Sequence, residues 1–370
     1  MSRQVTIVQP YVPAYRVPLF KRLHELLAQD DIDLEIAHGL VHRRGAARGD
    51  AVDLDFAKVV GSRQGTVGGH EIRHRRLRTW KAHLVIGEHA IGSMDTYELL
   101  VRSGGPTALW GHTRPTDAIN HSVVSRLNRW QLRRCRHFFA YTERGRQEAI
   151  AWGMDRHAIT VLNNTTDTAV LNEAMELVSA SDIDALRSRL QLGDGPVVLF
   201  IGSLDQAKRP DLFLATLETL RRRDPAIQAV MAGDGGERQQ LESAAASRPW
   251  LHLVGRVDAT ELAVLARVAD VLLVPAAVGL VAVDSLVLGL PIVTSPELGG
   301  HGPEFDYLHD GQNAVFTAGN AEALANGVKQ LLVDSERLRR VSAAGQADAS
   351  SLSIDAMADR FCEGIRAALD

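Results

Sequence analysis

The chain is poor in cysteine and has no long apolar run, and both shortages restrict its class. Only two cysteines occur among 370 residues, Cys135 and Cys362, and they lie far apart without the spacing of metal ligands. We therefore expect reduced thiols in a cytoplasmic protein. No apolar stretch approaches the roughly 20 residues that a membrane-spanning helix needs. A strand-like segment at 5–8 follows the N-terminus at once, so we expect no cleaved leader.

An excess of charge of one sign is also missing. Lys and Arg number 41 against 45 Asp and Glu, and the formal net charge is -4, which gives no reason to expect nucleic-acid binding. Local basic clusters at 74–78 and 133–136 keep contact with a membrane surface open. Such clusters are more often solvated helix faces or anion sites than lipid anchors.

No glycine motif of the form GxGxxG follows the first predicted strand. The glycines at 233–236 have a different spacing, so a nicotinamide-dependent dehydrogenase is disfavoured. The sequence also shows no solenoid-length repeat and no low-complexity linker.

Short apolar runs alternate with helical periodicity, which predicts parallel sheets covered by helices on both faces. The predicted strands lie at 5–8, 33–37, 83–86, 98–101, 108–110, 137–140 and 159–162 in the first half, and at 197–201, 229–232, 251–254, 271–274, 292–294 and 314–316 in the second. A polar, irregular stretch at 163–195 separates the halves. We therefore predict an α/β fold of two Rossmann-like domains facing each other across a cleft, at 1–170 and 171–348. A C-terminal helix at 349–370 is expected to pack back on the first domain.

The segment 271–293 predicts a strand, a turn at Gly279, a helix carrying Asp284, and a second strand entered through Gly289 and Pro291. A helix N-terminus at the carboxyl edge of a parallel sheet offers unpaired N–H groups and a positive dipole end to an anion. A carboxylate in that helix can accept hydrogen bonds from sugar hydroxyls. This combination suits a sugar nucleotide, although any doubly wound domain can turn its corners in the same way.

The segment 197–211 predicts a second anion-binding element. An apolar strand ends at Gly202, a loop carries Lys208 and Arg209, and Pro210 sits near the start of a helix. The two cations repel each other unless an anion binds, and a diphosphate spanning this loop and the Gly279 turn would satisfy both elements. The alternative is a pair of solvated surface cations.

The order of several weak motifs carries a resemblance over most of the chain. Segments 202–209, 230–236, 253–256, 269–275 and 279–291 together resemble the retaining nucleotide-sugar glycosyltransferases of family 4, which have the GT-B fold. The segment 302–311, with Glu304 and Gly311, is similar to the one that usually follows. In the first half, 9–20 resembles an N-terminal loop placed against donor and acceptor, and 110–113 resembles a motif of members that build bacterial polysaccharides.

The resemblance implies transfer of a sugar from a nucleoside diphosphate donor to the hydroxyl of a glycan, a lipid-linked sugar or a small molecule, with retention. It implies catalytic roles for His112, Lys208 and Arg209, although a lone His at a strand end is often structural. The implied donor-binding residues are Gly202, Ser203, Gly255, Arg256, Val257, Gly279, Leu280, Val281 and Asp284, with Asp284 at the ribose and the base near 255–257. The implied acceptor-side residues are Tyr11, Tyr15 and Arg16. Neither a metal nor a cofactor is expected, because the nucleotide sugar is a substrate.

The chain departs from the family pattern at three positions. Ala276 replaces an acidic residue eight positions before the helix carboxylate, Ser203 replaces a common Arg, and that carboxylate is Asp284 instead of Glu. A sugar-nucleotide epimerase or phosphorylase therefore stays open, as does a non-catalytic relative that only binds sugar nucleotides. The base, sugar, acceptor, linkage and oligomeric state are not set by the sequence.

Overall fold

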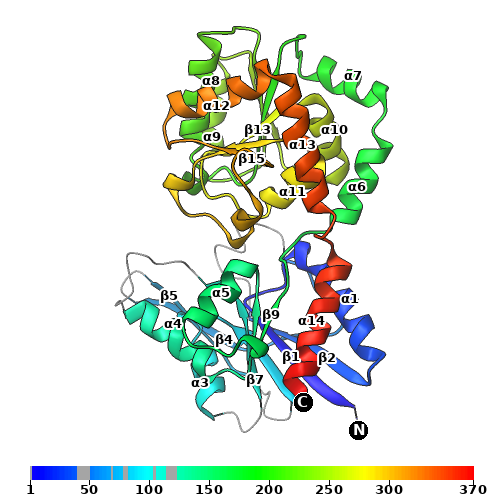
Figure 1. Cartoon of the computed structure of the whole chain (residues 1–370), viewed down its shortest axis with the longest axis vertical. Coiled ribbons are helices and arrows are strands. Elements are labelled where there is room, and N and C mark those ends of the chain that lie inside the picture. The colour runs from blue at the N-terminus through cyan, green and yellow to red at the C-terminus, as the bar shows by residue number, and fades with distance from the viewer. Residues whose placement is uncertain (1, 40–50, 68–69, 78–81, 103–105, 114–122) are drawn as a thin grey trace. The chain divides into compact units, whose positions relative to one another are not determined.

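Two parallel sheets carry the fold, as the repeated apolar runs predict. The computed structural model describes residues 2–39, 51–67, 70–77, 82–102, 106–113 and 123–370. The chain divides into two compact units, one of residues 1–164 with 354–370 and one of residues 165–353 (Figure 1). The predicted α/β class with two Rossmann-like domains is confirmed. No helix among these residues is long and apolar enough to cross a membrane.

The first unit contains a seven-stranded parallel sheet in the order β3-β2-β1-β6-β7-β8-β9. Its strands are β1 (Arg3–Gln9), β2 (Ile32–His38), β3 (Ala57–Val59), β6 (Leu84–Glu88), β7 (Thr107–Gly111), β8 (His137–Ala140) and β9 (Ile159–Val161). One face is covered by α1 (Val17–Ala28) and α14 (Ile354–Leu369), which lie side by side (Figure 1). The other face is covered by α3 (Met94–Arg102), α4 (Val123–Arg134) and α5 (Glu143–Ala151).

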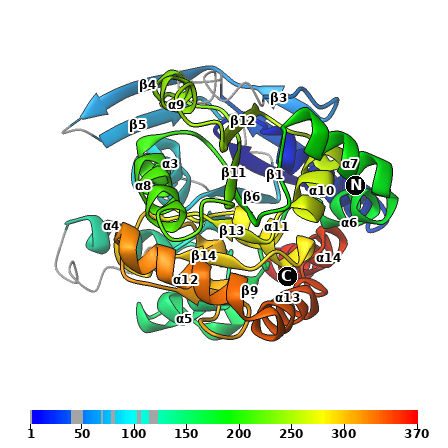
Figure 2. The ribbon, with the colours of Figure 1, turned by 90° about the horizontal axis from the view of Figure 1, so that it is seen from above.

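The second unit contains a six-stranded parallel sheet in the order β12-β11-β10-β13-β14-β15. Its strands are β10 (Val197–Ile201), β11 (Gln228–Ala232), β12 (Leu251–Gly255), β13 (Val271–Leu273), β14 (Ile292–Thr294) and β15 (Ala314–Phe316). Its helices are α6 (Thr168–Leu177), α7 (Ala180–Arg189), α8 (Pro210–Arg221), α9 (Arg238–Ala245), α10 (Ala259–Val268), α11 (Val281–Leu288), α12 (Ala321–Val333) and α13 (Ser335–Ala349). The helices α6, α7, α10 and α11 pack on one face, and α8, α9 and α12 on the other. Figure 2 shows α6, α7 and α10 as neighbours.

Two sequence predictions are wrong. Residues 98–101 belong to α3 and not to a strand, because the buried side chains of Thr96, Leu99 and Leu100 follow helical spacing. The stretch 163–195 is not irregular, because it contains α6 and α7. Asp167 caps the first of these helices, and Ser179 forms a capping box at the second.

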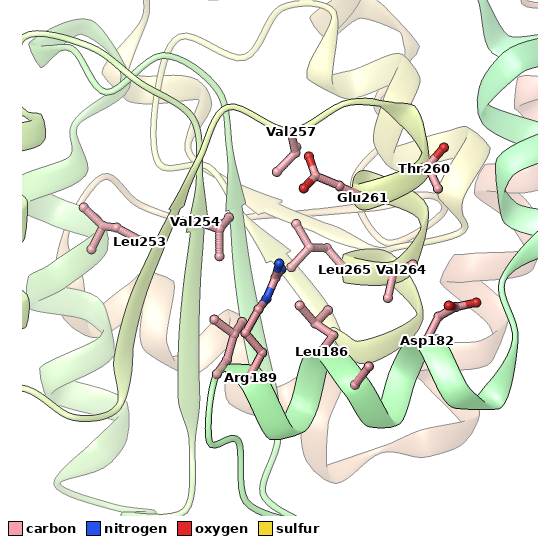
Figure 3. A pocket seen from close by; sticks show the side chains of 12 residues that line it. Asp182, Leu186, Arg189, Leu253, Val254, Val257, Thr260, Glu261, Val264 and Leu265 are labelled. Carbon is pink, nitrogen blue, oxygen red and sulfur yellow. The ribbon is translucent and has the colours of Figure 1, made fainter.

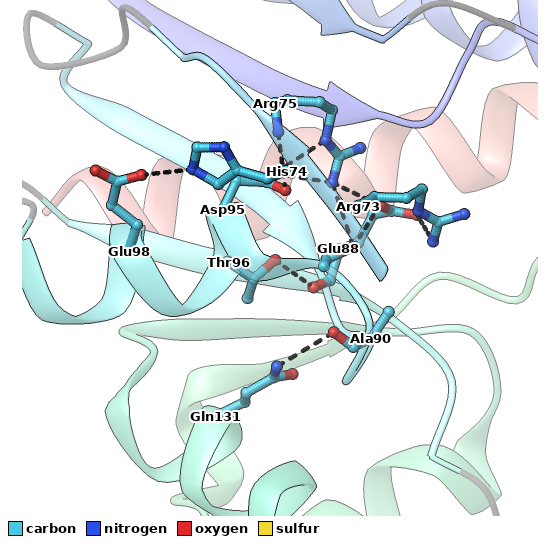
Figure 4. Close-up of polar contacts among 10 residues, drawn as sticks. Arg73, His74, Arg75, Glu88, Ala90, Asp95, Thr96, Glu98 and Gln131 are labelled. Atoms are coloured by element: carbon cyan, nitrogen blue, oxygen red, sulfur yellow. Dashed lines mark hydrogen bonds and ion pairs between the residues drawn. The ribbon is translucent and has the colours of Figure 1, made fainter. Parts of the chain in front are cut away.

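The basic cluster at 74–78 is partly an internal ion-pair network (Figure 4). It ends an antiparallel hairpin of β4 (Ser62–Val67) and β5 (His70–Arg75). Arg75 is 1% exposed, and its Nη2 lies 2.8 Å from Asp95 and 2.7 Å from Glu88. His74 Nε2 lies 3.1 Å from Glu98. These two residues are therefore used within the first unit, and Arg78 lies outside the described residues.

Both sheets reverse their strand order at one point. Neighbouring strands β1 and β6 in the first sheet, and β10 and β13 in the second, are followed by connections that run in opposite directions. In open α/β sheets, ligands bind outside the carboxyl ends of the strands at this switch point. The loops after these four strands are therefore where each unit is expected to hold a ligand.

Candidate functional site

Glycines end the strands beside the switch point of the second unit. Gly202 follows β10 and has φ +140°, and Gly233 follows β11 with φ +152°. A Cβ on Gly233 would collide with the carbonyl oxygen of Gly202, while its N–H donates to the Gly255 carbonyl at 2.7 Å. Backbone groups therefore pack closely against one another at the carboxyl edge of this sheet, and glycine is needed where they meet.

Lys208 crosses Gly202 and connects the two switch-point loops. A Cβ on Gly202 would lie 2.7 Å from Lys208 Cε, so only glycine leaves this path open. The Lys208 ammonium donates to the carbonyl oxygen of Ala277 at 2.9 Å, in the loop after β13. Burial lowers the pKa of Lys208, and the negative charges of Asp205 and Asp284 oppose that shift. A half-buried cation therefore stands between the loops.

Asp284 lies in the first turn of α11, within electrostatic reach of Lys208. Burial raises the pKa of Asp284 to about 7, against the opposing effects of a hydrogen bond from the Thr166 side chain and of the Lys208 charge. The carboxyl group is therefore close to half-protonated at neutral pH. A ligand that donates hydrogen bonds to the carboxylate would favour its ionised form.

The loop before α11 is tightly packed. Ala276 is 1% exposed, and Ala277 has φ +49°, a left-handed conformation that disfavours a side chain. Glu304 is buried, and its carboxylate lies 3.7 Å from the position that a Cβ on Gly279 would take. Leu280 is the N-cap residue of α11 and makes no side-chain capping bond. The amides that begin α11 therefore have no cap from that side chain.

The structure places Arg209 differently from Lys208. Its Nε donates to Asp211 Oδ1 at 2.9 Å and its Nη2 to Oδ2 at 2.8 Å. The side chain of Arg209 is 42% exposed and that of Asp211 is 60% exposed. The structure thus brings Gly202, Lys208, Asp284 and the Gly279 turn together, while Arg209 is paired with Asp211.

The remaining donor-side residues follow β10, β12 and β13. Ser203 is exposed, and Val257 is half-buried. Arg256 is exposed, and its Nε lies 3.8 Å from Asp234. Val281 begins α11 and is buried.

Val257 also lines a cavity of about 450 Å³ between α7, α10 and the end of β12 (Figure 3). Its surface is largely apolar and includes Leu186, Val254 and Leu265, with Arg189 extending over it. The acidic side chains at its rim, Asp182 and Glu261, belong to the capping boxes of α7 and α10.

In the first unit, an aromatic cluster surrounds a buried arginine. Arg16 is 3% exposed, and its guanidinium carbon lies 4.9 Å from the ring centre of Trp110 and 5.5 Å from that of Tyr141. Tyr15 is 38% exposed and lies 5.0 Å from the same cation, whereas Tyr11 is half-buried. The predicted acceptor-side residues therefore differ in exposure, with Arg16 inside the unit.

His112 follows β7 and lies next to this cluster. Its ring centre is 6.1 Å from that of Tyr141. The Nδ1 atom of His89 lies 3.3 Å from the carbonyl oxygen of His112. Burial lowers the pKa of His89 to about 4. A Cβ on Gly111 would lie 2.8 Å from His89 Cβ, so glycine permits this packing. A neutral His89 thus supports the backbone that carries His112.

Sequence reasoning did not single out Thr166, His89 or His301 as site residues. Each of these residues contacts a part of the site that lies on another segment of the chain. None of them occurs at a sequence spacing that would have indicated the contact. No group of three or more His, Cys, Asp or Glu in the described part of the chain is arranged to hold a metal ion.

Part of the chain matches a family of known proteins. Residues 182–348 match the sequence model of the family described as Glycosyl transferases group 1. The D-inositol 3-phosphate glycosyltransferase of Nocardia farcinica is 28% identical over 61% of this chain, and the match spans about half, 51%, of that relative. The phosphatidyl-myo-inositol mannosyltransferase of Mycobacterium leprae is 26% identical over 74% of this chain and 71% of its own.

A likeness to solved structures covers nearly the whole chain. The structure of Anabaena HepE in complex with UDP has a TM-score of 0.68 at 17% identity, covering 98% of this chain and 99% of that one. This likeness shows the fold, which is GT-B, as the sequence predicts.

Proposed function

Because residues 182–348 of this chain form a glycosyl transferases group 1 domain, we propose that the protein transfers a sugar from a nucleoside diphosphate sugar to a hydroxyl acceptor. The observation that supports this most is the placement of Lys208 across Gly202, between the two switch-point loops and within electrostatic reach of Asp284. A diphosphate needs a cation and N–H donors, and a ribose needs a hydrogen-bond acceptor. In this proposal, Lys208, the start of α11 and Asp284 supply them.

In the proposed reaction, the bond between the anomeric carbon and the diphosphate oxygen breaks as the acceptor oxygen bonds to that carbon. Lys208 and the amides at the start of α11 stabilise the charge that develops on the leaving diphosphate. Arg209 would add a second positive charge if it exchanged Asp211 for a phosphate. We further propose family 4 chemistry, in which attack occurs on the face that the diphosphate leaves and the configuration is retained. The departing phosphate accepts the acceptor's proton.

Other residues supply recognition in this proposal. Asp284 accepts hydrogen bonds from the ribose hydroxyls, and the base lies near 255–257. His112 of the first unit meets the donor sugar, and Tyr11, Tyr15 and Arg16 form or support the acceptor side. The proposal uses no metal ion and no cofactor.

For the acceptor, we propose a chemical class and no single compound. The two relatives are named for glycosyl transfer involving inositol 3-phosphate and phosphatidyl-myo-inositol. We propose a glycan, a lipid-linked sugar or a small hydroxyl compound, and a role in polysaccharide or glycoconjugate synthesis in the cytoplasm. Peripheral contact with a membrane would bring a lipid-linked acceptor within reach.

A screen with UDP, GDP, ADP, dTDP and CMP sugars tests the donor class. A ligand present at about 100 times its dissociation constant adds roughly 2.7 kcal/mol of stability, which thermal unfolding detects. We expect at least one sugar nucleotide to raise the melting temperature. If none does, the donor assignment fails.

Incubation of the stabilising sugar nucleotide with candidate acceptors then tests the reaction. Nuclear magnetic resonance of the product is expected to show the anomeric configuration of the donor, and an inverted product would contradict the retaining mechanism. Donor consumption without an acceptor, or a dependence on phosphate, would indicate an epimerase or phosphorylase. Binding without turnover on any acceptor would indicate the non-catalytic relative that Ala276 motivates.

A further inference from the structure

His301 connects the loop after β14 to the loop after β13. Its Nδ1 lies 3.2 Å from the backbone nitrogen of Val278, and its Nε2 lies 3.1 Å from the carbonyl oxygen of Ser295. The Val278 N–H can only donate, so Nδ1 accepts and Nε2–H donates to Ser295. Burial lowers the pKa of His301, in agreement with a neutral ring.

Backbone hydrogen bonds reinforce this connection. The Gly302 N–H donates to the Val278 carbonyl at 2.7 Å, and the Ala277 N–H donates to the Gly299 carbonyl at 3.3 Å. Val278 therefore has both its backbone groups bonded to residues 301 and 302. In these hydrogen bonds, the imidazole of His301 belongs to a side chain and the other groups belong to the backbone.

Val278, which these hydrogen bonds hold, is next to the residue that accepts the hydrogen bond of Lys208. Ala277, whose carbonyl oxygen binds the Lys208 ammonium, directly precedes Val278 and has a left-handed conformation. A backbone in that conformation persists only where its surroundings hold it. Two residues further on, Gly279 leads into α11.

We infer that His301 is a positioning residue of the phosphate site: by accepting from the Val278 N–H, it fixes the turn that holds Lys208 and begins α11. This inference rests on the proposed function, because it assigns the turn to a diphosphate. In this inference His301 acts through the Ala277–Gly279 backbone.

Two amide variants separate the two hydrogen bonds of the ring. In His301→Asn, the side-chain oxygen can replace Nδ1 and accept from Val278. In His301→Gln, the longer side chain can place its NH2 group at the position of Nε2 and donate to Ser295, which leaves Val278 without its acceptor. The pair is matched in chemistry and differs in which contact it keeps. His301→Phe keeps the ring contact with Phe305, whose centre lies 4.0 Å away, and loses both hydrogen bonds.

The test is calorimetric titration of wild type and variants with UDP and GDP, and with uridine and guanosine as controls. We expect roughly fivefold weaker diphosphate binding in the Gln and Phe variants, the effect of one lost hydrogen bond, and less than twofold in Asn. Nucleoside affinity is expected to stay unchanged. In kinetic assays, the donor KM should rise by the same factor while kcat changes less.

Amide hydrogen exchange of the free protein gives a readout that needs no ligand. Residues 276–280 should exchange faster in Gln and Phe than in Asn and wild type. Equal diphosphate affinity in wild type, Gln and Phe would overturn the role of His301 and leave the proposed function intact. Equal weakening in Asn and Gln would also overturn it, because ring packing would then explain the effect. Absence of diphosphate binding by wild type would remove the proposed function, and this inference with it.

Discussion

The two units share a strand order but fill the carboxyl ends of their strands differently. In the second unit, glycines let backbone groups approach one another closely, and the half-buried Lys208 crosses Gly202. In the first unit, Trp110 and Tyr141 close around the buried Arg16 at the corresponding edge. A sheet edge made of backbone suits phosphates, which need amides and a cation, whereas an edge made of aromatic side chains suits a less charged ligand.

The two edges also differ in how they can be recognised: the edge of the second unit follows from a sequence motif, and that of the first unit from the packing of distant segments. The edge of the second unit depends on the absence of side chains at Gly202 and Gly233, and these glycines are visible in the sequence. The aromatic edge depends on side chains from four distant segments, including α14, whose Met357 Sδ accepts from Arg16 at 4.0 Å.

The largest effect is expected in the first unit, at His112. If this side chain meets the donor sugar, His112→Ala should lower turnover by about a hundredfold or more, the scale of acid–base or electrostatic assistance, and lower donor affinity much less. Steady-state kinetics measure both, with His157→Ala, an exposed histidine, as the control. Near-wild-type turnover in His112→Ala would make this histidine structural.

In the second unit, Gly202→Ala should displace Lys208. The new Cβ would lie 2.7 Å from Lys208 Cε, and φ +140° disfavours any side chain. We expect about tenfold weaker nucleoside diphosphate binding, the scale of one charge-assisted hydrogen bond. Gly236→Ala is the control, because a Cβ there meets nothing within 4 Å. Equal diphosphate affinity in both variants would contradict the role of Gly202 in placing Lys208.

Asp284 should make nucleotide binding depend on pH. Its pKa is about 7 in the free protein, so the carboxylate is the minor form at pH 6 and the major form at pH 8. If the ribose requires the carboxylate, affinity should rise up to about tenfold between these values. Asp284→Asn should lose that pH-dependent component and bind the donor more weakly. The same pH profile in both proteins would remove Asp284 from the site.

The raised pKa of Asp284 also affects stability. The folded protein keeps a proton that the unfolded chain loses above the ordinary aspartate value. This contribution to the free energy of unfolding is therefore fully present at low pH and is lost as the pH rises towards 7.

The smallest effect is expected at Ala277. Because its φ is +49°, Ala277→Gly should relieve strain and raise the free energy of unfolding by about 1 kcal/mol or less. Ala343→Gly, at an exposed position within α13, should instead lower it by about 1 kcal/mol. Urea unfolding of both variants checks the opposite signs, and a loss of stability in Ala277→Gly would contradict the strain assigned to this residue.

Much of the second unit was predictable from the sequence. Its strands are short apolar runs, and Gly202, Lys208, Gly279 and Asp284 stand at fixed positions around them, so the spacing alone placed them at one edge. The bidentate pairing of Arg209 with Asp211 was not predictable, because it depends on the left-handed conformation of Arg209 at the helix start.

The first unit was harder to predict. The apolar residues of α3 resemble a strand when they are read without their helical spacing. The burial of Arg16 depends on rings contributed by Trp110 of β7 and by Tyr141, which follows β8, and on a helix at the other end of the chain. Such contacts leave no local pattern. The supporting role of His89 likewise follows from the close approach of Gly111, which appears only in the folded chain.

Calorimetric titration of wild type, Lys208→Ala and Arg209→Ala with UDP and GDP tests the central claim most directly. We expect wild type to bind at least one of them, and Lys208→Ala to bind it at least tenfold more weakly, because a charge-assisted hydrogen bond contributes roughly 1.5–3 kcal/mol. Arg209→Ala should lose less, since Arg209 must first leave Asp211. The bare nucleoside should bind all three proteins alike. Unchanged diphosphate affinity in Lys208→Ala would contradict the phosphate site at this edge of the sheet.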